Sequence, residues 1–173
     1  MHVRIMATRM QKTLAKCTST LEGTSLHTGQ TVKLVIKPAE PNTGFKFRRI
    51  DLPDKPFLDA SAAKVQSVER ATTIADGAVK VHTVEHILSA LTGMGVDNAI
   101  IEMDANEPPI GDGSALPYVE MIKKAGIVEQ NAPLKVWEIR EPIKVENKNS
   151  ITVSHSSMNR GTMCPLCAIT TIL

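Results

Sequence analysis

Aromatic side chains are scarce in this chain of 173 residues, which has one Trp, one Tyr and three Phe. Proteins that bind single-stranded nucleic acids stack bases on aromatic rings, so the composition argues against a base-stacking RNA binder. The hydrophobic fraction is nevertheless 42%. The core must therefore be built from Val, Ile, Leu, Ala and Met, as is ordinary for a mixed α/β domain. The length fits one full domain, or one domain and the beginning of another.

The chain also lacks an excess of charge of either sign. It has 20 basic and 18 acidic residues, which gives a net charge of +2. The basic residues are scattered, so no nucleic-acid footprint is predicted. The one close basic group, Lys46 to Arg49, alternates with Phe45 and Phe47. This pattern favours a solvated strand face over a phosphate site.

Long apolar runs are absent as well. Residues Met1 to Met10 have no apolar run of signal-peptide length, and no stretch approaches the roughly 20 apolar residues of a membrane span. No membrane-spanning segment is predicted. The three cysteines, Cys17, Cys164 and Cys167, are an odd count without a secretory signal. We therefore expect a cytoplasmic protein in a reducing compartment.

Several short segments have the period and turn signals of β-strands. An Asp76-Gly77 turn indicates a hairpin between two of them, Ala71 to Ile74 and Val79 to His82. The other predicted strands are Thr31 to Lys37, Gly44 to Ile50, Asn98 to Met103, Leu134 to Val145 and Ser150 to Val153.

Two helices are predicted between these strands. The first runs from about Val84 to Thr92 with Thr83 as its N-cap, and the second runs from Ser114 to Gly126. Asp112 precedes the second helix and is interpreted as a loop residue that satisfies nearby amides. The order of elements predicts an α/β (α+β) two-layer sandwich: a mostly antiparallel sheet with two helices packed on one face.

The segment His82-Thr83-Val84-Glu85-His86 carries the main chemical signal, because it places imidazoles beside a carboxylate at a helix start. Zinc hydrolases use this pairing: an imidazole holds the ion and a carboxylate accepts a proton from water. One interpretation is an inverzincin-type peptidase in which His82 and His86 are both ligands. On one helix they would lie about 40° apart in azimuth, so geometry permits this.

A second interpretation keeps only Glu85 and His86 as functional residues. It is favoured over the peptidase because Thr83, as N-cap, would leave His82 outside the helix at the end of a strand. The residues alone also allow a structural role: a carboxylate near the positive end of the helix dipole and a satisfied histidine. Without any family comparison, that structural role is the preferred interpretation.

Several separated motifs surround this segment: Glu22 to Gly29, Asn42 to Gly44, Arg48 to Asp51, Thr83 to Asn98, Ile101 to Asp104 and Glu107 to Ala115. Together they resemble the UDP-3-O-acyl-N-acetylglucosamine deacetylases, the zinc enzymes of bacterial lipid A biosynthesis. The resemblance covers about Gln11 to Glu146.

The resemblance implies a reaction and residue roles. His86 would be a zinc ligand, and Glu85 would be the general base of a hydrolysis that removes the N-acetyl group from UDP-3-O-acyl-N-acetylglucosamine. His82 matches a family position that is not a ligand. His27, in the Leu-His-Thr-Gly segment, would lie near the active site as a substrate-binding residue, although satisfying loop backbone is an equal alternative.

The family has a second domain that supplies the other zinc ligands from a His-Lys-x-x-Asp motif, and this chain lacks that motif. No histidine here is followed four residues later by Asp or Glu. We therefore expect residues 1–10 to be an N-terminal extension, 11–130 the first deacetylase domain and 131–153 the opening strands of an incomplete second domain. Residues 154–173 would be a divergent tail that can be out of frame. Such a truncated chain should bind zinc weakly and be inactive alone.

A different class of function is a non-catalytic module that binds a sugar nucleotide or a protein. The resemblance suggests one partner of this kind, because some family members are fused to a hydroxyacyl-carrier-protein dehydratase. The nucleotide sequence beyond the codon for Ser154 separates the two hypotheses. A continuation into His-Lys-x-x-Asp in another frame would favour truncation.

Overall fold

The computed structural model describes residues 9–134, 143–146, 151–154 and 170–172. The chain divides into two compact units, of which one is Met10–Ala132 and the other joins Met1–Arg9 with Pro133–Leu173. All of the candidate site residues lie in the first unit. The expectations for residues 1–8 and for most of the tail fall outside the described residues.

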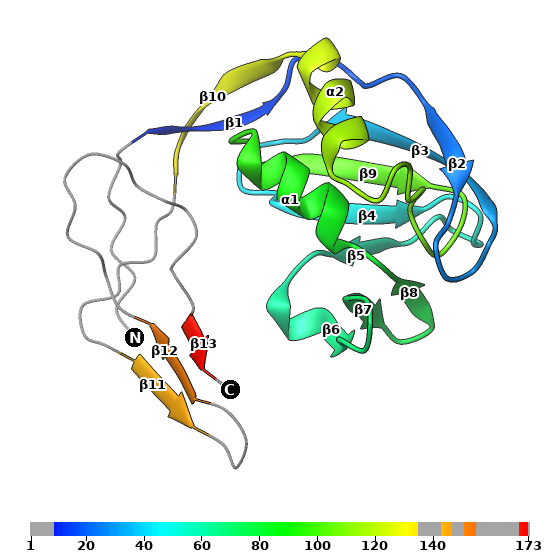
Figure 1. Cartoon of the computed structure of the whole chain (residues 1–173). Helices are drawn as coiled ribbons and strands as arrows, with labels where there is room; N and C mark the ends of the chain where they lie inside the picture. Colours follow the sequence, from blue (N-terminus) through cyan, green and yellow to red (C-terminus); the bar gives the residue numbers. More distant parts are fainter. Residues whose placement is uncertain (1–8, 135–142, 147–150, 155–169, 173) are drawn as a thin grey trace. The chain divides into compact units, whose positions relative to one another are not determined.

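A five-stranded sheet forms the centre of the first unit, in the order β2-β3-β9-β4-β5 (Figure 1). Its neighbours pair antiparallel except β4 and β9, which are parallel. The middle strand alternates buried and half-buried residues, so one face supports the core. The strands are β2 (Leu21–Thr24), β3 (Thr31–Pro38), β4 (Phe45–Arg49), β5 (Phe57–Asp59) and β9 (Ala99–Met103).

Two helices cover one face of this sheet, α1 (Glu85–Gly93) and α2 (Leu116–Ala125) (Figure 1). Each buries one face in a single core with the sheet, since Ile87 and Leu91 of α1 and Ile122 of α2 pack with Ile101 of β9. Pro117 lies in the first turn of α2, where its missing N–H costs nothing. The predicted fold class, mostly antiparallel strands with two helices on one face, is confirmed.

A small antiparallel sheet, β6-β7-β8, lies between β5 and α1 in the sequence. Its strands are β6 (Val65–Ser67), β7 (Thr73–Asp76) and β8 (Val79–Val81), and a short 3-10 helix, Ala62–Lys64, precedes them. The predicted hairpin is the β7–β8 pair, with Gly77 in the left-handed region at φ 58°. Three residues, 82–84, connect β8 to the start of α1.

The remaining strands lie toward the ends of the chain. β1 (Met10–Leu14) pairs with β10 (Ile127–Pro133). In the second unit, β11 (Ile143–Glu146), β12 (Ile151–Ser154) and β13 (Thr170–Ile172) form an antiparallel sheet. The first two overlap the strands predicted near residues 134–145 and 150–153. No helix in the described part of the chain is long and apolar enough to span a membrane.

The expected solvated face of β4 is only partly correct. Arg48 is partly exposed, as predicted: its guanidinium donates a hydrogen bond to the Glu102 carboxylate and lies over the Phe57 ring. Arg49 is instead buried at 7% exposure, because it alternates onto the core side with Phe47. Its guanidinium donates to both carboxylate oxygens of Asp51 and to the Lys80 carbonyl, which satisfies the buried charge.

Candidate active site at the start of the first helix

Glu85 and His86 are the first two residues of α1, and both are half-buried. Thr72, just before β7, ties the helix start to the small sheet. Its N–H donates to Glu85 Oε2 at 3.1 Å, and its carbonyl accepts the Val84 N–H at 3.3 Å. The hydrogen bond from Thr72 thereby fixes the orientation of the Glu85 carboxylate relative to β7.

The His86 ring makes no hydrogen bond to any described residue, while the backbone carbonyl of His86 accepts from Ser89. A zinc ligand needs one ring nitrogen that no protein donor occupies, and His86 meets that condition among the described residues. However, the described residues contain no group of three His, Cys, Asp or Glu side chains that could hold a metal ion. Catalytic zinc sites generally have three protein ligands, so His86 fits zinc as one ligand of a larger set.

His82 lies outside the helix, as predicted, and directly follows β8, which ends one residue earlier than the predicted strand. Its N–H donates to the Asn106 carbonyl at 2.8 Å. Its ring Nδ1 shares a hydrogen bond of 2.9 Å with the Thr73 hydroxyl. His82 and His86 are therefore not ligands placed on successive turns of one helix, which the peptidase interpretation requires.

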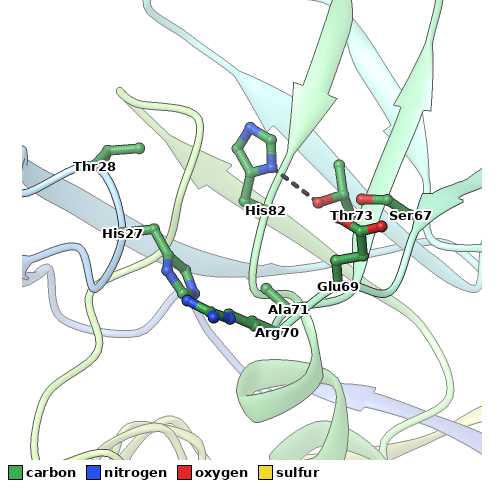
Figure 2. Close-up of a pocket in the computed structure, with 8 residues that line it drawn as sticks. All are labelled: His27, Thr28, Ser67, Glu69, Arg70, Ala71, Thr73 and His82. Atoms are coloured by element: carbon green, nitrogen blue, oxygen red, sulfur yellow. Dashed lines mark hydrogen bonds between the residues drawn. The ribbon is translucent and has the colours of Figure 1, made fainter.

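His27 lines a hollow with a volume of about 320 Å³. Figure 2 shows that this hollow is bounded by two segments, the turn between β2 and β3 and the small sheet. His27 and Thr28 come from the turn, whereas Thr73 comes from the small sheet and His82 directly follows its last strand. The structure thus brings His27 and His82 to one hollow. Glu85 and His86 do not line it; Glu85 is connected to its wall through Thr72.

Glu107 connects these parts, and sequence reasoning assigned it no role. Its side chain is fully buried. The carboxylate accepts the Thr83 hydroxyl at 2.7 Å, the Thr28 N–H at 2.9 Å and the His27 N–H at 3.0 Å. The one sequence signal was a carboxylate directly before two prolines, Pro108 and Pro109, and that signal names no partner.

The pKa of Glu107 reflects two opposing effects. Burial alone would raise the pKa of the carboxyl, because it disfavours the charged form. The hydrogen bonds from Thr83, Thr28 and His27 outweigh burial and hold the pKa below its usual range. The carboxylate is therefore ionised at neutral pH.

The expected N-cap role of Thr83 is wrong. The cap position is Val84, and no side chain caps the helix there. Thr83 has a left-handed backbone with φ 54°, and its hydroxyl donates to Glu107 instead. An N-cap residue normally has an extended backbone, so the left-handed backbone of Thr83 is incompatible with the cap position, and its hydroxyl makes a charge-assisted hydrogen bond to the carboxylate instead. By contrast, Asp112 behaves as predicted, since its Oδ1 accepts the N–H and the hydroxyl of Ser114.

Comparison with known proteins adds to this geometry. A sequence model of the family described as UDP-3-O-acyl N-acetylglycosamine deacetylase matches residues 11–163. Two curated proteins named UDP-3-O-acyl-N-acetylglucosamine deacetylase match over 125 residues, which is 72% of this chain and 41% of each relative. The one from Methylococcus capsulatus is 46% identical and the one from Saccharophagus degradans 50%.

A third relative with the same name, from Pseudomonas entomophila, is 47% identical over 137 residues. That match covers 79% of this chain and 45% of the relative. The chain thus spans less than half the length of the curated relatives it matches.

Proposed function

The chain belongs to the UDP-3-O-acyl N-acetylglycosamine deacetylase family, and from this premise we propose that it carries one part of a zinc-dependent deacetylase site. The substrate would be UDP-3-O-acyl-N-acetylglucosamine, which the names of the relatives indicate. The observation that supports this most is the pair Glu85 and His86 at the start of α1, with the Glu85 carboxylate oriented by Thr72.

Each of these residues has a role in the proposed hydrolysis. His86 would hold zinc as one of its ligands, and the ion when bound would supply a Lewis acid that polarises the amide carbonyl. Glu85 accepts the proton of the attacking water as the water oxygen bonds to the carbonyl carbon. The bond to nitrogen then breaks, acetate leaves and the sugar keeps a free amine. The proton on Glu85 is available for that nitrogen.

We further propose that the remaining zinc ligands come from outside the described residues. The reason is the ligand count: His86 is one, and catalytic zinc sites generally use three. The chain alone should then bind zinc weakly. We expect zinc titration of the wild type, Glu85→Ala and His86→Ala chains to give weak binding in all three. Tight, stoichiometric binding that only His86→Ala removes would contradict this incomplete site.

Activity is tested with the chain alone and with a joined protein. In the joined protein, residues 1–146 are followed by the second half of the Pseudomonas entomophila relative. We expect no acetate release from the chain alone, and acetate release from the joined protein. Glu85→Ala should lower kcat by about 10² to 10⁴, the usual contribution of a general base. Acetate release by the purified chain alone, free of contaminating enzyme, would contradict the incomplete site.

His27 is proposed as a substrate contact. Its side chain is exposed and faces the hollow shared with His82, while its backbone N–H is held by Glu107. His27→Ala in the joined protein should therefore raise KM more than it lowers kcat. A lowered kcat with unchanged KM would assign His27 to the chemical step instead.

A further inference from the structure

One short segment, residues 105–110, makes hydrogen bonds to both segments that bound the hollow. The carbonyl of Asn106 accepts the His82 N–H, on the small-sheet side. On the turn side, the Glu107 carbonyl accepts the Ser25 hydroxyl at 2.9 Å, and the Ile110 N–H donates to the Thr24 carbonyl at 3.0 Å. The segment is thus fixed to two parts of the chain that are otherwise distant in sequence.

The side chain of Glu107 joins the same two parts directly. One oxygen accepts the hydroxyl of Thr83, two residues before Glu85. The other accepts the N–H groups of His27 and Thr28. A single carboxylate therefore links the His27 turn to Thr83, two residues before α1.

We propose that Glu107 is a positioning residue that holds the His27–Thr28 turn in register with Glu85 and His86, acting through Thr83. The catalytic meaning of this role rests on the deacetylase function proposed above. Glu107 touches neither substrate nor metal in this role. It keeps the substrate-side turn and the helix start at one fixed separation, which catalysis requires to within fractions of an ångström.

The backbone of Thr83 explains why such a link is needed. A β-branched residue at φ 54° is strained and is retained only when its surroundings hold it. The 2.7 Å hydrogen bond to Glu107 is a direct restraint of this kind. Without it, the chain between β8 and α1 can relax toward an ordinary backbone, and the start of α1 shifts with it.

Hydrogen exchange in the 173-residue chain tests the link without any assay of activity. Glu107→Gln keeps the shape but turns one acceptor oxygen into an NH₂ donor, which would face N–H and O–H donors. We expect the Thr28 amide to exchange at least about tenfold faster, as when a charge-assisted hydrogen bond is lost. The Ile36 amide in the central sheet should be unchanged.

Asp104→Asn is the matched control, because Asp104 is a neighbouring exposed carboxylate that accepts the Lys33 N–H. It should leave Thr28 exchange unaltered. Equal Thr28 exchange in Glu107→Gln and the wild type would overturn the proposal.

Kinetics in the joined protein tests the effect on the site. Thr83→Val keeps the branched shape and removes the hydroxyl, so it should lower kcat about tenfold to a hundredfold through misplacement of Glu85 and His86. Thr83→Ser keeps the hydroxyl and should retain most of kcat, when both variants are assayed well below their melting temperatures. Equal kcat in Thr83→Val and Thr83→Ser would contradict the positioning role.

The two proposals fail in different ways. A joined wild-type protein that folds but releases no acetate contradicts the deacetylase function, whereas the exchange result still decides the link between Glu107 and the turn. Unchanged exchange in Glu107→Gln contradicts the link even when the joined protein is active.

Discussion

A fully buried carboxylate such as Glu107 is stable only when strong donors surround it. Its donors are one hydroxyl and two backbone N–H groups, all within hydrogen-bonding distance. Because these donors favour the charged form, the pKa in the folded chain lies below its value in the unfolded chain. The folded state is therefore stabilised when the carboxyl is ionised.

This gives a pH dependence with a definite sign. The contribution of Glu107 is fully present above the pKa of an unfolded glutamate, about 4.3. It is lost as the pH falls through the lower pKa of the folded state. Thermal melting should show Glu107→Gln less stable than the wild type by about 1 to 3 kcal/mol at pH 7. The difference should shrink steadily below about pH 4.3. A difference that stays constant down to acid pH would exclude an ionised Glu107 as its origin.

At the scale of elements, two salt bridges connect three adjacent strands on the outer face of the central sheet. Glu102 of β9 pairs with Lys37 of β3 at 2.6 Å and with Arg48 of β4 at 3.0 Å. Burial would raise the pKa of Glu102, but these two cations lower it. The three strands are therefore joined by charge on one face and by the apolar core on the other.

Removing the charge of Glu102 should destabilise the folded chain. We expect Glu102→Gln to lower the free energy of unfolding by about 1 kcal/mol, a modest value because both cations are partly solvated. Glu22→Gln is the control, since Glu22 pairs with Lys33 at 3.7 Å and both side chains are more than half exposed. Urea unfolding at low and high salt measures both, and equal effects of the two variants would contradict a special role for Glu102.

At the scale of the whole molecule, the candidate site and the buried core belong to the same compact unit. Within residues 9–134, the buried hydrophobic side chains lie between Leu14 and Ala132. The unit Met10–Ala132 also contains the central sheet, the small sheet and both helices.

Residues 9–134 should consequently fold without the rest of the chain. We expect this shortened chain to unfold cooperatively, with a melting temperature within a few degrees of that of the full chain. For a domain of this size, such a difference corresponds to a change of less than about 1 kcal/mol in the free energy of unfolding. Calorimetry of the two chains makes the comparison. A shortened chain that fails to unfold cooperatively would show that residues beyond 134 stabilise the core.

Local patterns in the sequence determined most of the secondary structure around the candidate site. Hydrophobic spacing and turn residues predicted the central strands, the Asp76–Gly77 hairpin and both helices, because these signals depend on residues a few positions apart. The same reasoning placed His82 outside the helix, as the structure has it. The roles of Glu85 and His86 came from family resemblance and stay predictions.

Only the tertiary structure decided how the charged and polar groups are satisfied. Glu107 reads as a loop residue, yet its donors lie 24 positions away at Thr83 and 80 positions away at His27. The sequence pattern predicts Thr83 as a helix cap and Arg49 as a solvated side chain. In the structure, Thr83 donates to the buried charge of Glu107, and Arg49 is itself a buried charge. A buried charge needs hydrogen-bond partners, and most of these partners are distant in sequence, so no local pattern encodes the set.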